Sequence, residues 1–144
     1  MSEALHIVCP HCNTVNRLPA GRLAHRPKCG KCCRDLFTGH TIALTGANFQ
    51  THVDRNDIPL VVDFWAPWCG PCMTMAPQYA QAAGMLEPRA RLAKVDTDAE
   101  QLLGTQFSIR SIPTLVLFKG GREVARHPGA MRTADIVRWV QSRV

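Results

Sequence analysis

The chain of 144 residues has no apolar stretch that approaches the roughly 18 consecutive residues of a membrane-spanning helix. Its first eight residues also lack the basic start and the long apolar segment of a secretory signal. We therefore expect a cytoplasmic protein with no membrane partner. Nearly half of the chain is hydrophobic, which is enough to bury a core, and the length suits one domain and a small module.

A framework of structural disulfides is not expected either, because cytosolic thiols are kept reduced. The chain nevertheless has seven cysteines. Metal binding and catalysis remain as their functions.

Four of the cysteines form two C-x-x-C pairs, separated by sixteen residues, in the first part of the chain: Cys9, Cys12, Cys29 and Cys32. This spacing is typical of a zinc site, and a closed tetrahedron of sulfurs leaves no open position for catalysis. The surrounding segment is rich in turn formers, so four unligated thiols would leave it with nothing to hold it. We predict a module over residues 1–38 with one structural zinc ion, and we expect it to be disordered without the metal.

Cys33 directly follows a predicted ligand and is a fifth thiol near this site. It is either a surface or packing cysteine, or it exchanges with Cys32 as a ligand or forms a disulfide with it under oxidant. The second alternative would make zinc retention depend on the redox state. His11 lies inside the first pair, and we interpret it as solvated because four cysteines are available.

The remaining two cysteines, Cys69 and Cys72, lie where a predicted strand is followed by a helix. Residues 60–65 form the apolar run of a buried strand, and residues 73–86 are typical of a helix. Unpaired backbone N–H groups and the helix dipole favour a thiolate at Cys69, and one helical turn brings Cys72 beside it. The alternative is half of a zinc site. A C-x-x-C pair near a βαβ pattern instead indicates a dithiol redox site.

Strand and helix patterns alternate through residues 39–144, and a hairpin and a helix follow at the end. The expected strands are 42–44, 60–65, 92–95, 114–118 and 123–126, and the expected helices are 46–53, 73–86, 99–107 and one capped by Thr133. This order predicts an α/β domain in which helices cover both faces of a mixed sheet.

Residues 61–72 resemble the most characteristic segment of the thioredoxin family nearly residue for residue. The resemblance extends over roughly the last hundred residues: Pro77 at a helix kink, residues 94–96 in the next strand, residues 111–115 in the loop with the family's cis-proline, Gly120 and Gly121 at a hairpin turn, and Gly129 beside the substrate groove. The four-cysteine extension resembles the zinc-containing bacterial branch, thioredoxin 2. Ser111 is a departure, because many thioredoxins have glycine there, and it affects only the expected partner preference.

The resemblance implies a thioredoxin fold over residues 39–144 and the activity of a protein-disulfide reductase without an organic cofactor. Cys69, the more exposed thiol, is expected to attack the client disulfide, and Cys72 to resolve the mixed disulfide. Asp63 is expected to deprotonate Cys72 through water, because burial raises a carboxyl pKa, and Lys94 to tune its charge. The alternative for Asp63 is a buried carboxylate satisfied by hydrogen bonds.

The family also implies which residues contact client proteins. They are an exposed apolar rim and the residues around the dithiol and the cis-proline: Trp68, Gly70, Pro71, Ile112, Pro113 and Gly129. A cis-proline would prevent metal capture by the dithiol and would leave the backbone of Ile112 free to pair with an extended client segment. The implied partners are disulfide-containing proteins and an NADPH-dependent thioredoxin reductase.

Other functions stay open. An oxidase or isomerase is one, although the missing signal sequence argues against it. The first forty residues have six lysines or arginines against Glu3 and Asp35, so they could bind nucleic acid. Phe37 is the single aromatic residue there for base stacking, and four thiolates around zinc carry a net charge of about −2, so nucleic acid is not expected. The extension could also select client proteins or sense oxidative stress.

Overall fold

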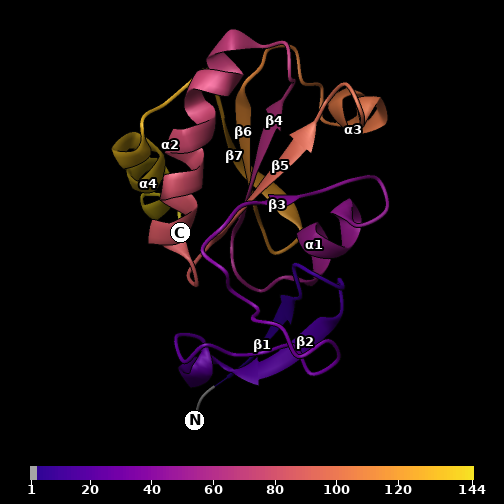
Figure 1. The fold of residues 1–144 in the computed structure, drawn as a ribbon, viewed down its shortest axis with the longest axis vertical. Coiled ribbons are helices and arrows are strands. Elements are labelled where there is room, and N and C mark those ends of the chain that lie inside the picture. The colour runs from indigo at the N-terminus through magenta and orange to yellow at the C-terminus, as the bar shows by residue number, and fades with distance from the viewer. Residues whose placement is uncertain (1–2) are drawn as a thin grey trace.

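The computed structural model describes residues 3–144, so Met1 and Ser2 of the predicted module lie outside the described part. The chain forms two sheets (Figure 1). The small sheet is an antiparallel pair, β1 (Ala4–Val8) and β2 (Val15–Pro19), followed by a single 3-10 turn, η1 (Ala20–Arg22). The sequence patterns indicate no strands here, because turn-forming residues such as Pro10, Asn13, Asn16 and Pro19 lie within and between the two strands.

The large sheet has five strands in the order β3-β5-β4-β6-β7. Their bounds are β3 Ile42–Ala43, β4 Leu60–Trp65, β5 Arg91–Asp96, β6 Thr114–Lys119 and β7 Arg122–Pro128. The first three are parallel, and β6 and β7 form an antiparallel hairpin beside β4. The predicted mixed sheet is confirmed, with each strand within two residues of its expected bounds.

Helices cover both faces of this sheet (Figure 1). They are α1 Phe49–Arg55, α2 Gly70–Leu86, α3 Gln101–Gln106 and α4 Thr133–Gln141. Because side chains alternate along a strand, β4 supplies Val61 to a core under α2 and α4, and Val62 to a core under α1 and α3. Among residues 3–144, none of the helices has the length and apolar character needed to cross a membrane.

One cap differs from expectation, and α1 begins at Phe49, three residues later than predicted. The prediction that Thr133 caps α4 is wrong: Arg132 is the cap residue, and the Thr133 hydroxyl instead donates to the carbonyl oxygen of Gln78 in α2, at 3.1 Å. The Thr133 hydroxyl therefore bonds to another helix instead of to a backbone N–H group in the first turn of α4. Pro77 lies inside α2, which continues on both sides of it.

The small sheet lies at the end of the large sheet where β4 begins, and β4 leads away from it towards the start of α2 (Figure 1). Apolar side chains fill the contact between the two sheets: Ile7, Leu18, Leu36 and Ile58, together with Cys9 and Cys29. The small sheet therefore shares a core with Ile58, in the segment that leads into β4.

Candidate active site and metal site

The dithiol lies at the junction of β4 and α2. The helix begins at Gly70, three residues earlier than expected, so Cys69 is its cap residue and Cys72 lies in its first turn with Pro71. The two sulfurs are joined as a disulfide, and the backbone N–H of Cys72 donates to Sγ of Cys69 at 3.2 Å. A negative charge on Cys69 would thus meet an N–H donor and the positive end of the helix dipole. Cys69 is 5% exposed and Cys72 is 2% exposed.

A loop and a turn lie beside the disulfide. The carbonyl oxygen of Ile112 is 3.6 Å from Sγ of Cys69, and the Ile112–Pro113 peptide bond is cis. The N–H of Gly129, which follows β7, donates to the carbonyl oxygen of Pro113 at 2.8 Å. Gly129 has a φ of 97°, a left-handed conformation that favours glycine. The structure therefore brings Ile112, Pro113 and Gly129 together next to Cys69.

Asp63 lies in the middle of β4 and has no exposed surface. In the described part of the chain, neither of its carboxylate oxygens has a hydrogen-bond partner among the protein groups. Burial raises the pKa of Asp63 from 3.8 to about 7, and the positive charge of Lys94 offsets this in part. Lys94 faces Asp63 across the β4–β5 pairing, and its Nζ lies 4.5 Å from the ring centre of Trp65.

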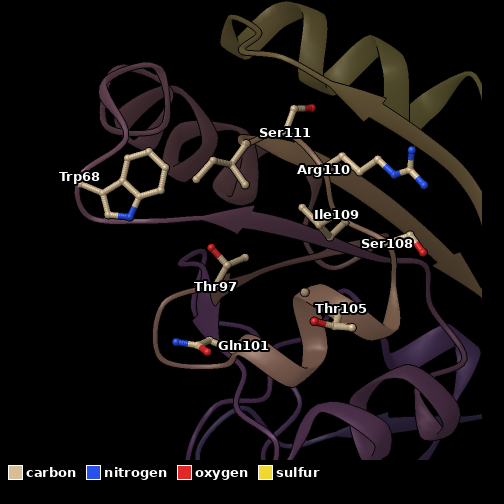
Figure 2. A pocket seen from close by; sticks show the side chains of 10 residues that line it. Trp68, Thr97, Gln101, Thr105, Ser108, Ile109, Arg110 and Ser111 are labelled. Carbon is tan, nitrogen blue, oxygen red and sulfur yellow. The ribbon is translucent and has the colours of Figure 1, made fainter.

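Trp68 is 71% exposed, and its indole N–H donates to the Asp98 carboxylate at 3.1 Å. Beside it lies a pocket of about 480 Å³ (Figure 2). The sequence analysis missed most of its lining: Thr97, Gln101, Gly104, Thr105, Ser108, Ile109 and Arg110. Four of them, Gln101, Gly104, Thr105 and Ser108, have the spacing of one helix face, but only the topology places that face next to Trp68.

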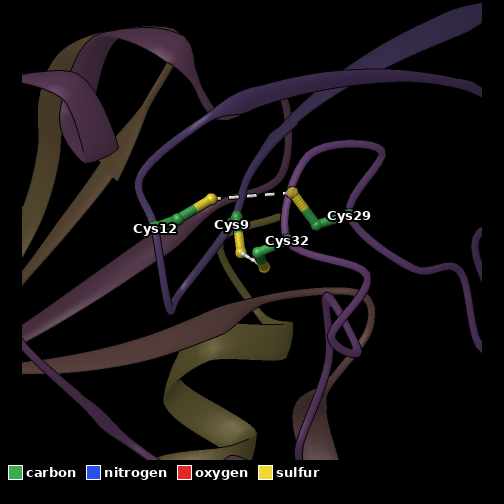
Figure 3. A group of neighbouring side chains, drawn as sticks. All are labelled: Cys9, Cys12, Cys29 and Cys32. Carbon is green, nitrogen blue, oxygen red and sulfur yellow. Dashed lines mark hydrogen bonds between the residues drawn. The ribbon is translucent and has the colours of Figure 1, made fainter.

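The four predicted metal ligands form one group (Figure 3). Their sulfur atoms all lie within 4.8 Å of one another, with Cys9 and Cys32 at 3.6 Å and Cys12 and Cys29 at 3.7 Å. A tetrahedral zinc ion with Zn–S bonds of about 2.3 Å requires sulfurs about 3.8 Å apart. The residues therefore fit a tetrahedrally bound metal ion.

Each cysteine pair is a tight turn of the same construction. The backbone N–H groups of His11 and Lys31 each donate, at 3.4 Å, to the first sulfur of their pair. The residue after each pair, Asn13 or Cys33, has a left-handed φ of 64° or 66° and donates its N–H back to the first cysteine. Cys33 is exposed and lies outside the four-sulfur group. The His11 ring is hydrogen bonded to the carbonyl oxygen of Asp35 at 3.1 Å, which agrees with its interpretation as a non-ligand.

A buried arginine joins the metal site to the large sheet. Arg91, the first residue of β5, has no exposed surface. Its guanidinium donates to the carbonyl oxygen of Val8 at 2.5 Å and to that of Leu36, and its Nε lies 3.6 Å from the Glu87 carboxylate. Val8 directly precedes Cys9, one of the four predicted ligands. Arg91 therefore holds two segments of the metal-binding part from within the sheet.

Two further buried polar side chains contact the metal-binding part: His52 lies in α1, and Asn56 is the residue at the C-terminal end of that helix. Asn56 accepts the backbone N–H of Val8 at 2.8 Å, and the His52 ring lies 3.0 Å from the Asn13 side-chain oxygen. Burial, with a contribution from Arg91, lowers the pKa of His52 from 6.5 to about 4, so the ring is neutral. The sequence analysis missed these residues, because a single polar residue in a strand or short helix carries no signal of a distant partner.

Known proteins resemble both parts of the chain. The family model described as thioredoxin matches residues 40–142, and the one described as thioredoxin 2, N-terminal, matches residues 8–33. Thioredoxin C-3 of Corynebacterium nephridii is 43% identical over 96% of this chain and 94% of its own length. Thioredoxin 1 of Nostoc sp. is 44% identical over 61% of this chain and 82% of its own length. Thioredoxin of Haemophilus influenzae is 37% identical over 70% of this chain and 94% of its own length.

Proposed function

Because the chain belongs to the thioredoxin family, we propose that it is a cytoplasmic reductase of protein disulfides that acts through Cys69 and Cys72. Thioredoxins are disulfide oxidoreductases, and this chain also has the zinc-ribbon module of the thioredoxin 2 branch. The observation that carries the assignment of residues is the Cys69–Cys72 disulfide at the start of α2, beside the carbonyl of Ile112. Four neighbouring thiolates persist only where thiols stay reduced, which supports the cytoplasm.

In the proposed reaction, the Cys69 thiolate attacks one sulfur of the client disulfide and releases the other as a thiolate. Cys72 then attacks Cys69 in the mixed disulfide, which frees the reduced client and leaves the Cys69–Cys72 disulfide. Asp63 takes the proton of Cys72 through a bridging water, and a pKa of about 7 suits a base at neutral pH. Lys94 keeps that pKa from rising further.

The client would bind across the two sides of the dithiol. Trp68, Gly70 and Pro71 form the side at the start of α2, and Ile112, Pro113 and Gly129 form the other. An extended client segment would pair with the backbone of Ile112. An NADPH-dependent thioredoxin reductase would return the oxidised protein to the dithiol form, as is general in the family.

For the metal site we propose one zinc ion, held by Cys9, Cys12, Cys29 and Cys32, in a module that spans residues 1–38 and precedes a thioredoxin domain over residues 39–144. Four thiolates suit zinc in a closed structural site. When bound, the ion supplies the cross-link between the two turns.

We also propose that Cys33 links this site to the redox state. Its neighbour Cys32 is a ligand, so two-electron oxidation by peroxide would join Cys32 and Cys33 as a disulfide, reduce the peroxide to water and release zinc. A Cys33→Ser variant should then release zinc more slowly than the parent under peroxide. Equal release from both proteins would exclude the role.

Trapping of the mixed disulfide tests the assignment of the two catalytic thiols. Without a resolving thiol, a Cys72→Ser variant should accumulate a covalent adduct with a disulfide client, and mass spectrometry should find it on Cys69. A Cys69→Ser variant should form little adduct. The reverse pattern would contradict the assigned roles.

A further inference from the structure

The pocket beside Trp68 extends along Gln101 and Thr105 of α3 towards Ser108 and Arg110 (Figure 2). Trp68, which directly precedes Cys69, and Ile112, whose carbonyl oxygen is 3.6 Å from Sγ of Cys69, line the near end. A client segment in a mixed disulfide with Cys69 therefore passes over the mouth of this pocket.

The charge of the pocket lies at its other end. Of the lining residues, all of them within 3–144, Arg110 is the one with a charged side chain, and it lies next to Ser108, away from Trp68 (Figure 2). Across the described residues, the ion pairs and side-chain hydrogen bonds do not include the Arg110 guanidinium. An unpaired guanidinium is well suited to bind a carboxylate in a bidentate geometry.

Two acidic side chains near the Trp68 end already accept hydrogen bonds. The carboxylate of Asp98 accepts the Trp68 indole N–H, and that of Asp96 accepts the backbone N–H of Asp98 at 2.9 Å. The other polar lining residues are neutral: Thr97, Gln101, Thr105, Ser108 and Ser111. The pocket thus offers a cation and neutral hydroxyl and amide groups to an incoming side chain.

We propose that this pocket is a subsite for an acidic side chain of the client, aspartate or glutamate, two residues from the cysteine that Cys69 attacks. In an extended segment, every second side chain points the same way and lies about 7 Å further along. That spacing carries a side chain from the dithiol over Ile112 into the pocket, with its carboxylate towards Arg110. This subsite rests on the proposed reductase function and specifies which disulfides the protein prefers.

Single-turnover reduction of model peptides tests the subsite. The pre-reduced protein is mixed with short disulfide-linked peptides that carry Glu, Gln or Lys two residues before or after the cysteine. For an exposed ion pair we expect the Glu peptide to react about two- to fivefold faster than the Gln peptide at one of the two positions. An Arg110→Gln variant should bring this ratio to one, and Arg110→Glu should favour the Lys peptide.

An Arg122→Gln variant is the matched control. It removes the same charge at an exposed position on the β6–β7 hairpin, at the end of β6 away from the dithiol, and it should keep the preference for Glu. Equal rates for Glu and Gln peptides with the parent protein, or a preference that survives in Arg110→Gln, would overturn the subsite while leaving the reductase intact. A parent protein that reduces none of the peptides would overturn both.

Discussion

At the scale of single residues, Asp63 has the environment least suited to its charge. The sequence indicates its burial, since it interrupts an apolar strand, but not that its carboxylate lacks a hydrogen-bond partner within residues 3–144. We expect Asp63→Asn to slow the attack of Cys72 on the mixed disulfide more than the first attack by Cys69, because only the resolving thiol loses its base. Rapid-quench separation of the two steps measures this. Equal slowing of both steps would contradict the role.

The same carboxylate makes stability depend on pH. An unfolded aspartate loses its proton near pH 3.8, whereas folded Asp63 keeps it until about pH 7. Between these values the folded state binds more protons, so the free energy of unfolding falls as the pH rises. The loss is complete above pH 7 and amounts to at most about 4 kcal/mol, since each pKa unit corresponds to about 1.4 kcal/mol.

Asp63→Asn should remove this loss and make the oxidised protein more stable than the parent at pH 8, with a smaller difference at pH 5. Urea unfolding at the two pH values measures it. Asp54→Asn, at an exposed position on α1, is the control and should change stability little at either pH. If the difference in the free energy of unfolding between the parent and Asp63→Asn is the same at pH 8 as at pH 5, Asp63 is not a buried carboxyl group that titrates between these values.

At the scale of elements, the sequence predicts most of the thioredoxin domain, because its strands and helices have clear periodicity and a specific motif at residues 61–72. It predicts from spacing alone that Cys9, Cys12, Cys29 and Cys32 form one group that could hold a metal ion. It does not predict β1 and β2, which lie among turn-forming residues, or the cap of α4, where Gln78 of another helix replaces a local partner. Nor does it predict the pocket along α3, because that surface forms only when distant loops meet.

The start of β5 provides a second test at this scale. Arg91→Met would leave two buried carbonyl oxygens without their donor and the Glu87 carboxylate without its counter-charge. Breaking a buried pair in this way costs about 3–5 kcal/mol, which urea unfolding would detect. Arg89→Met, two residues earlier and exposed, is the control and should cost little. Equal effects of the two substitutions would show that Arg91 does not hold the metal-binding part.

At the scale of the whole molecule, the two cysteine sites lie at opposite ends of β4 (Figure 1). Six residues of strand separate them by roughly 20 Å. The four clustered cysteines therefore lie too far from Cys69 and Cys72 of the same molecule to exchange disulfides with them. The shared core and the contacts of Arg91, Asn56 and His52 connect the metal-binding part to the large sheet.

Removal of the metal should therefore destabilise more than the small sheet. Without its cross-link, the segment around the four cysteines loses order, and Arg91 and Asn56 lose their backbone partners at Val8. We expect a chelator to lower the melting temperature and to speed hydrogen exchange at the starts of β4 and β5 as well as in β1 and β2. Faster exchange confined to β1 and β2 would mean that the two parts are independent.

Reduction of insulin, coupled to NADPH oxidation through thioredoxin reductase, tests the central claim most directly. Zinc content is measured in parallel, and Cys69→Ser and Cys72→Ser variants serve as controls. We predict that the metal-loaded protein reduces insulin disulfides with consumption of NADPH, and that both substitutions abolish turnover. A metal-loaded, folded protein that leaves insulin unreduced would contradict the assignment of this chain as a protein-disulfide reductase.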